Sequence, residues 1–284
     1  MPMNDCCDLH THSIFSDGTC SPAEILSLAV SAELSAVALT DHNTVSGLPS
    51  FLEAAAEKNI PAVPGVEIST GWNGKELHIL GLFLPAASFD AVSAFLDIIN
   101  VRKEENNRKL IRTLSAAGYE LDYDAIRRSH PEGSVNRAVI AAAMLEKGYI
   151  ASVQEAFQTL LSSENGYYIP PERISAFDAI AFLASIHAVP VLAHPFLSLT
   201  ETELRQFLPE AKKYGLAAIE TVYSSYSEET EALAKTIAAE FHLRQSGGSD
   251  FHGGNKPDIR LGTGKGSLHV PADFVKQLQE VVSE

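Results

Sequence analysis

The sequence lacks the features of a membrane or secreted protein. It contains no run of 18 apolar residues that could form a membrane-spanning helix. Its first ten residues, MPMNDCCDLH, lack the basic start and the apolar stretch of a secretory signal peptide. We therefore expect a cytoplasmic protein with no membrane partner.

Cysteine is scarce. The three cysteines, Cys6, Cys7 and Cys20, are odd in number and crowded near one end, which argues against a disulfide framework. Because adjacent residues of a strand point to opposite faces, we do not expect Cys6 and Cys7 to bind one ion together. We expect them to pack as ordinary thiols.

Lysine and arginine are also few compared with the acidic residues. The 284 residues include 21 Lys and Arg against 36 Asp and Glu, which gives a net charge of −15. This balance disfavours broad binding to nucleic acid, so we expect no stable nucleic-acid complex. A small anion is still an acceptable substrate where bound metal supplies local positive charge. Hydrophobic residues make up 45% of the chain, enough to bury the core of a barrel-sized domain.

Short apolar segments alternate with helical patterns along much of the chain. Seven segments have the composition of buried strands, and they are Cys6–His12, Ala36–His42, Ile60–Ser69, Glu76–Leu84, Val189–Pro195, Leu216–Tyr223 and Arg244–His252. Five helices are expected between them, at Ser21–Ala32, Pro49–Lys58, Phe177–Ile186, Glu201–Tyr214 and Ser227–Phe241. This alternation predicts an α/β fold with a mainly parallel sheet, closed or nearly closed into a barrel.

Residues 88–166 interrupt the alternation. They contain helical patterns through VRKEENNRKLIRTLSAAG, around Val135–Lys147 and around Val153–Leu161, without a convincing strand. The segment is too long for a structureless loop in a compact domain. We predict a helical insertion subdomain over residues 88–166, and a barrel domain over residues 1–87 and 167–284.

Metal-ligating side chains recur at the predicted strand ends. On a strand, His10 and His12 share a face, so one ion can bind both imidazoles. Later strands add His42, Glu67, His78, His194, Asp250 and His252, and Asp17 follows the first strand in a turn-like Ser-Asp-Gly. The carboxyl ends of barrel strands converge on one rim, so these nine side chains predict a metal centre there.

Nine candidate ligands are too many for one ion. A zinc site needs three or four protein ligands, so nine suggest two or three ions. Glu67 is the natural bridge because a carboxylate has two oxygens. Asp41 is expected to hydrogen-bond a ligating histidine.

Six motifs together resemble the PHP (polymerase and histidinol phosphatase) phosphoesterases. They are HTHSIFSDGT, ALTDHNTVSG, PGVEIS, ELHILGL, VLAHP and SDFHG, in this order along nearly the whole chain. The resemblance implies a distorted seven-stranded (β/α)7 barrel with three divalent metal ions, commonly zinc, manganese or iron. It assigns the first ion to His10, His12, Glu67 and Asp250, the second to Glu67, His78 and His194, and the third to Asp17, His42 and His252.

The insertion is similar to that of the branch that hydrolyses nucleotide phosphates. Relatives there often have Arg-x-His in the second insertion helix, where this chain has Arg137-Ala138-Val139, and histidine where it has Tyr226. The resemblance therefore implies a small phosphorylated substrate, either an AMP-type nucleotide, a nucleoside 3′,5′-bisphosphate or a short oligonucleotide, with Tyr226 near the substrate.

The expected chemistry is attack on phosphorus by a hydroxide that bridges the first two ions, since metals lower the pKa of bound water. Arg137 is the candidate for a fork-like phosphate contact, with a surface helix arginine as the alternative. His252 or a water on the third ion supplies the proton of the leaving group.

Three other functions compete with this one. A histidinol-phosphate phosphatase keeps the same chemistry. An amidohydrolase also has His-x-His on its first strand, but that family usually has a bridging lysine where this chain has Glu67. A regulatory module would hold metal without catalysis, although all nine ligands are present.

Overall fold

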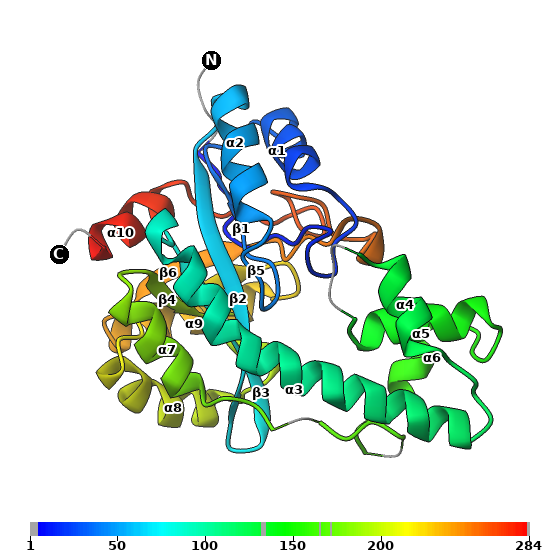
Figure 1. The fold of residues 1–284 in the computed structure, drawn as a ribbon. Coiled ribbons are helices and arrows are strands. Elements are labelled where there is room, and N and C mark those ends of the chain that lie inside the picture. Colours follow the sequence, from blue (N-terminus) through cyan, green and yellow to red (C-terminus); the bar gives the residue numbers. More distant parts are fainter. Residues whose placement is uncertain (1–4, 132–134, 165, 171, 283–284) are drawn as a thin grey trace. The chain divides into compact units, whose positions relative to one another are not determined.

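The computed structural model describes residues 5–131, 135–164, 166–170 and 172–282. The chain forms two compact units (Figure 1), which we call unit 1, Met1–Leu96 with Arg173–Glu284, and unit 2, Asp97–Glu172. These limits differ from the predicted 88 and 166. The first turns of helix α3 (Phe89–Ala116) belong to unit 1, where the ring of Phe95 stacks on Phe182 at 4.0 Å.

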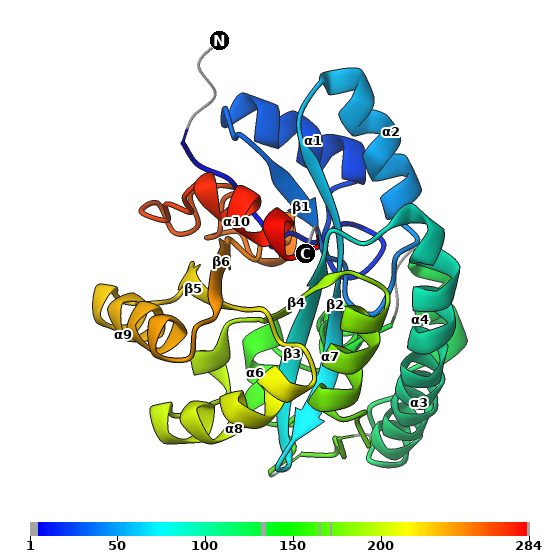
Figure 2. The same cartoon turned by 90° about the vertical axis from the view of Figure 1, so that its left-hand side faces the viewer.

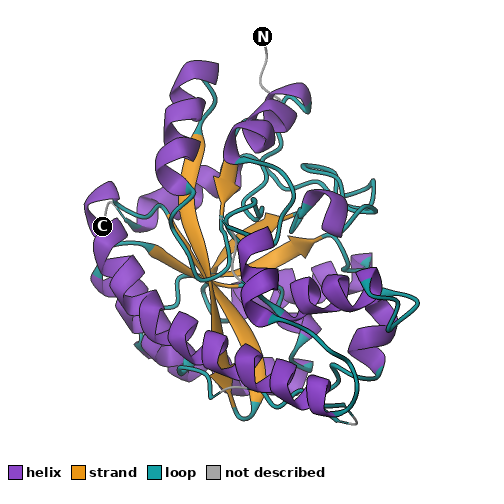
Figure 3. Cartoon of the chain, turned by 45° about the vertical axis from the view of Figure 1, so that its right-hand side comes forward, coloured by secondary structure: helices purple, strands orange, loops and turns teal. Residues whose placement is uncertain are grey.

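Unit 1 contains a curled sheet of six strands in chain order, visible at the centre of Figure 3. The strands are β1 (Val37–Leu39), β2 (Ala62–Trp72), β3 (Lys75–Leu82), β4 (Val189–Leu192), β5 (Ala218–Tyr223) and β6 (Arg244–Gly248). Three pairings are parallel, but β3 runs antiparallel to both neighbours, so the sheet is mixed. Asn73 and Gly74 explain this reversal, because both have positive φ and form the tight turn between β2 and β3.

The prediction of seven strands is not confirmed. Within the described residues, the predicted first strand, Cys6–His12, forms isolated bridges instead. Asp8 bridges Val37, and Thr11 bridges Phe251. The segment is nevertheless hydrogen-bonded on both sides, since Ala38 N donates to Asp8 O at 2.8 Å and Asp250 N donates to His10 O at 2.9 Å. The histidines of this segment thus lie beside both β1 and the residues that follow β6.

The helices of unit 1 pack around this sheet (Figure 2). They are α1 (Pro22–Ser31), α2 (Leu48–Lys58), α7 (Ala176–Ser185), α8 (Glu201–Lys213), α9 (Glu228–Glu240) and α10 (Asp273–Val281), with short 3-10 turns at Ala86–Ser88, Pro195–Leu197 and Gly253–Asn255. Ser21 and Glu24 form the capping box that starts α1. Helix α7 covers β2, β3 and β4, whereas α9 covers β5 and β6. Helix α10 was not predicted.

The interior of unit 1 has an apolar core, and polar side chains lie next to this core at one end of the sheet. Leu80 and Leu82 of β3 point into the core beside Phe274 and Leu278 of α10. Because side chains alternate along a strand, His78 continues the row of Leu80 and Leu82 at the next position on that face. Apolar packing of the strands therefore fixes the direction of the polar side chains above it.

Unit 2 is helical and has its own core. It contains the rest of α3, with α4 (Tyr123–Ser129), α5 (Arg137–Glu146) and α6 (Val153–Gln158). Its buried residues include Leu114, Ile140 and Met144. Among the described helices of the whole chain, none is long and apolar enough to cross a membrane.

Candidate metal centre

All nine predicted ligands lie in unit 1, and the structure brings them together. Their ligand atoms form four overlapping groups, each with atoms within 4.8 Å of one another. The groups are His12, Asp17, His42 and His252; His10, Glu67 and His194; His10, His12 and Asp250; and His42, Glu67 and His78. The sharing of His10, His12, His42 and Glu67 between groups makes this one continuous cluster.

Glu67 is at the centre of the cluster. Its Oε1 lies 2.7 Å from His78 Nδ1 and 3.1 Å from His194 Nε2. Its Oε2 lies 3.1 Å from His10 Nε2, 3.2 Å from His12 Nε2 and 3.1 Å from His42 Nδ1. Both oxygens of one buried carboxylate thus face five imidazoles, which is the geometry of a bridging group.

Two further carboxylates lie on either side of His252. Asp250 Oδ1 is 3.2 Å from His12 Nε2 and 3.4 Å from His252 Nδ1. Asp17 Oδ1 is 3.2 Å from His252 Nε2. The rings of His12 and His252 stack with their centroids 4.1 Å apart. The Asp-x-His and His-x-His motifs are therefore in direct contact, although they are far apart in the sequence.

Backbone geometry also sets this arrangement. His194 and Asp250 have φ values of +27° and +57°, a region that residues other than glycine rarely adopt. Such strain is typical of functional sites. Gly248 is needed for close approach, because a Cβ there would lie 2.4 Å from the Cβ of His10.

Glu220 of β5 supports the centre, and the sequence analysis missed it. His10 Nδ1 lies 2.9 Å from Glu220 Oε1, and the His194 N–H donates to Glu220 Oε2 at 2.6 Å. When His10 Nδ1 donates this hydrogen bond to Glu220, the lone pair of His10 Nε2 can bind a metal ion. Asp41 does not hydrogen-bond a histidine as expected, since among the described residues it accepts from the Ser13 and Ser16 hydroxyls, both at 2.6 Å.

We expect Glu220→Gln to weaken metal binding about 10- to 100-fold, the usual cost of losing a partner of a metal-bound histidine. The amide nitrogen of glutamine cannot accept the hydrogen bond from His194 or His10. Metal affinity measured by competition with a chelating dye checks this result. Glu203→Gln is the matched control, since Glu203 binds Lys75 and Thr200 outside the cluster. Equal affinity in both variants would contradict the role of Glu220.

The electrostatics of the cluster are strongly perturbed. Burial lowers the pKa of His12, but the nearby carboxylates of Asp250 and Glu67 outweigh it and raise the pKa to about 9. Burial likewise lowers the pKa of His78, and the Glu67 charge raises it to about 10. His42 behaves oppositely, since burial dominates and lowers its pKa to about 3. The carboxyl pKa of Glu67 is lowered despite burial, because His42, His10 and His78 surround it.

The donor set fits divalent cations. Within the cluster, the buried atoms His10 Nε2, His12 Nε2, His42 Nδ1 and Glu67 Oε2 have no hydrogen-bond partner among the described residues. Buried polar atoms are normally satisfied, so four orphans in one cluster require an explanation. Imidazole nitrogens and carboxylate oxygens are the ligands that zinc, manganese and iron accept. Cations held among these atoms would satisfy all four.

The remaining predicted residues have other surroundings. The guanidinium of Arg137, in unit 2, lies 4.2 Å above the Tyr168 ring. Val139, which stands where relatives often have histidine, is buried in the core of unit 2. In unit 1, the Tyr226 hydroxyl accepts from the Phe196 N–H at 3.0 Å.

Two side chains near Asp250 were also missed by sequence reasoning. Tyr223 OH donates to Asp250 Oδ2 at 2.8 Å, and Lys256 Nζ lies 2.6 Å from the same oxygen. They bind Oδ2 and leave Oδ1 to face His12 and His252. Lys256 follows the SDFHG motif closely, and that proximity was the available signal.

A separate group lies near the N-terminus. Cys6 Sγ is 2.8 Å from His269 Nδ1, with Asp5 beside them. Cys7 is buried, and burial raises the pKa of its thiol. The two adjacent cysteines thus have different surroundings, as their opposite orientation on an extended segment predicts.

Comparisons with known proteins identify the family of the chain. A family model described as PHP domain matches residues 8–173. A 5′-3′ exoribonuclease of Haemophilus influenzae is 30% identical over 250 residues, which cover 86% of this chain and 89% of the relative. A 3′,5′-nucleoside bisphosphate phosphatase of Chromobacterium violaceum is 30% identical over 248 residues, or 86% of each protein.

A solved structure extends the likeness to the fold. A protein of Bifidobacterium adolescentis, provisionally described as a metal-dependent phosphoesterase, superposes with a TM-score of 0.84 at 26% identity, covering 97% of this chain and 96% of that one. The matched family model spans more than half of the present chain, including the segments that carry His10, Glu67 and His78. The chain belongs to the PHP domain family of metal-dependent phosphoesterases.

Proposed function

We propose that the chain hydrolyses phosphate monoesters of a small nucleotide, of the AMP or nucleoside 3′,5′-bisphosphate type, or of a short oligonucleotide. The observation that carries the proposal is the Glu67 carboxylate, whose two oxygens face five histidines. The relatives described as an exoribonuclease and a nucleoside bisphosphate phosphatase support a nucleotide substrate.

Three divalent ions are the occupancy that we propose for the cluster. His10, His12, Glu67 and Asp250 would hold the first, Glu67, His78 and His194 the second, and Asp17, His42 and His252 the third. The observed group of His12, Asp17, His42 and His252 supports the third assignment, and that of His10, His12 and Asp250 supports the first. When bound, such ions lower the pKa of a coordinated water and neutralise phosphoryl oxygens.

The protein residues would position these ions and the substrate. Glu220 orients His10, while Tyr223 and Lys256 orient Asp250. The His252 Nδ1 lies 2.8 Å from the Asp250 carbonyl oxygen, so Nδ1 carries the proton and donates it in that hydrogen bond. The lone pair of Nε2 then faces Asp17. This tautomer suits a metal ligand better than a proton donor. We propose Arg137 and Tyr226 as substrate contacts, since a guanidinium fork and a phenol both suit a nucleotide phosphate or base.

Phosphate release across a substrate panel tests the proposal. The panel contains nucleoside monophosphates, nucleoside 3′,5′-bisphosphates, short RNAs, histidinol phosphate and a cyclic amide, each with manganese and with zinc. We expect the highest kcat/KM with a nucleotide or oligonucleotide. A preference for histidinol phosphate, or hydrolysis of the amide alone, would replace the proposed substrate. No turnover of any substrate by metal-loaded protein would favour a regulatory role.

A further inference from the structure

The negative net charge of the chain is not evenly spread. Unit 2 holds nine of the 21 Lys and Arg residues, although it spans only 97–172. Five of them lie in the segment RKEENNRKLIR, residues 102–112, together with two glutamates. This segment is part of α3, so its side chains are fixed to a rigid helix. A locally basic face thus exists on an acidic protein.

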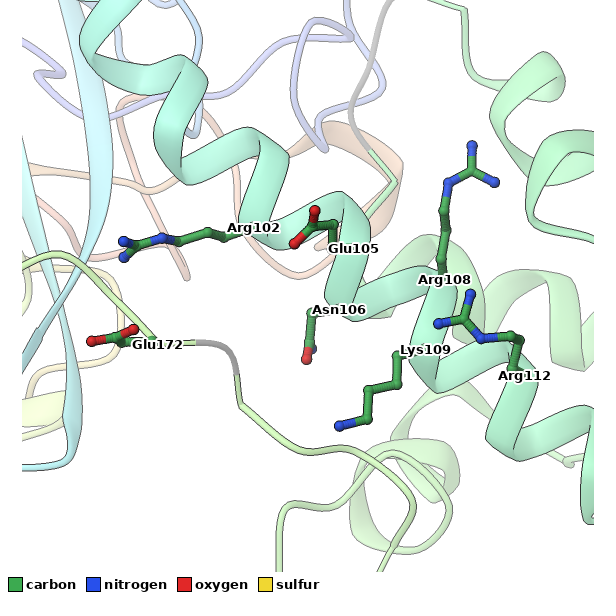
Figure 4. A pocket seen from close by; sticks show the side chains of 7 residues that line it. All are labelled: Arg102, Glu105, Asn106, Arg108, Lys109, Arg112 and Glu172. Carbon is green, nitrogen blue, oxygen red and sulfur yellow. The ribbon is translucent and has the colours of Figure 1, made fainter.

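A hollow of about 520 Å³ opens along this face (Figure 4). Its lining comes entirely from unit 2 and consists of Arg102, Glu105, Asn106, Arg108, Lys109, Arg112 and Glu172. Figure 4 shows Arg102 and Glu172 toward one end, and Arg108, Lys109 and Arg112 toward the other. Four cations and two carboxylates therefore line the hollow, and one of the carboxylates, Glu105, lies on α3 with the cations.

Three of these cations lack partners in the part of the chain that the structure describes. Arg108 is paired, with Glu104 at 2.9 Å and Asp124 at 3.0 Å. Arg102, Lys109 and Arg112 form no such ion pair. Like charges on one helix face repel one another, so a bound polyanion would stabilise this row of three cations. From residue 102 to residue 112 the helix rises about 15 Å, which is longer than a single phosphate group.

An exposed aromatic residue, Tyr167, shares a recess with one of these cations, Lys109. A shallow recess beside the hollow is lined by Asn106, Lys109, Leu110, Thr113, Tyr167 and Ile169, so it shares Asn106 and Lys109 with the hollow. Tyr167 is 37% exposed and Ile169 is 60% exposed. Cations that follow a backbone, with an aromatic ring on which a base can stack, are the combination found in proteins that bind single-stranded nucleic acid.

We propose that this face of unit 2, which we call the α3 basic face (Arg102, Lys109, Arg112 and Tyr167), binds single-stranded RNA. The three cations contact successive phosphates, and Tyr167 stacks on a base. Binding to this face does not depend on the metal centre; only the step from binding to turnover rests on the proposed function. The proposal revises the expectation from net charge, because the contact needs local rather than overall positive charge.

The salt dependence of RNA binding tests the charge contacts. A short fluorescent oligoribonucleotide is titrated with metal-free full-length protein in the presence of a chelator, and anisotropy gives the affinity. Each phosphate contact contributes about 0.7 to the slope of log K against log salt for single strands. We expect Arg102→Gln/Lys109→Gln/Arg112→Gln to reduce the slope by about 2, so that between about 50 and 200 mM salt the parent loses about 20-fold more affinity than the variant.

A matched triple variant separates this face from net charge. Lys58→Gln/Arg128→Gln/Lys276→Gln removes the same charge from exposed residues outside the hollow. It should keep the parental slope. The proposal would be overturned if both triple variants reduced the slope equally. It would also be overturned if neither variant reduced it.

Two further arms identify the ligand. Tyr167→Ala should weaken binding about 5- to 150-fold without changing the salt slope, because stacking contributes about 1–3 kcal/mol per base. Single-stranded DNA of the same sequence should compete with the RNA, whereas a nucleoside bisphosphate should compete poorly. Competition by the bisphosphate at equal concentration would mean that the face serves a mononucleotide, against the proposal. If RNA binds but no ester is hydrolysed, only the proposed function fails.

Discussion

Glu67→Gln is expected to abolish metal binding at the bridging position and to reduce kcat/KM for phosphate release by about 10³-fold or more. Removing a single donor from a charge-stabilising site costs about 10²–10³ in kcat. Glu67 faces five histidines through two oxygens, so the loss here exceeds that of a single contact. Glutamine keeps the shape of the side chain but places a neutral amide among imidazoles that need a negative neighbour.

Metal content and turnover must be measured together for this variant. Elemental analysis of purified protein gives the ions per chain, and phosphate release from a nucleotide gives the rate. Circular dichroism shows whether the variant is folded. Glu57→Gln is the control, because Glu57 is exposed on α2 and belongs to none of the four ligand groups. Full turnover with normal metal content in Glu67→Gln would remove Glu67 from the centre.

The sequence predicts most of the elements of unit 1 because their hydrophobic patterns are strong. The five helices expected there correspond to α1, α2, α7, α8 and α9, and six of the seven expected strands to β1–β6. The direction of β3 was not predicted, since burial patterns carry no direction. Asn73-Gly74 was the available signal, because this pair is a strong hairpin turn.

The prediction of a strand at Cys6–His12 was not confirmed, for a different reason. A strand needs a regular ladder, and Cys6–His12 alternates between short contacts with β1 and with residues 247–251. The same irregularity brings His10 and His12 to Glu67. Composition shows that such a segment is buried, but it does not show how its hydrogen bonds are shared between two neighbours.

The ligands were predictable, whereas their supporting residues were not. Ligands have a recognisable chemistry and fall in motifs. Glu220 is a single carboxylate within an apolar strand, and Lys256 is one lysine in a loop. Their roles come from tertiary distances, 2.9 Å to His10 Nδ1 and 2.6 Å to Asp250 Oδ2, which no local pattern encodes.

Removal of metal should strongly destabilise unit 1. An ion that binds only the folded state stabilises it by about 4 kcal/mol when present at about 1,000 times its Kd. For a unit of this size, 1 kcal/mol corresponds to about 2–4 °C in Tm, so each ion should raise Tm by about 10 °C. Without an ion, the buried carboxylates Glu67, Asp17 and Asp250 have only the neighbouring histidines, and Lys256 at Asp250, to offset the cost of burying their charge.

Thermal unfolding of chelator-treated protein, with and without added manganese or zinc, measures this effect. Unit 2 contains none of the nine ligands, so hydrogen exchange should show the gain in protection around residues 8–12 and 247–252 rather than in α5. Glu67→Gln should lose most of the gain, while Glu57→Gln should keep it. An unchanged Tm with every metal tested would contradict a folded-state metal centre, because these four orphaned buried atoms would then be satisfied without a cation.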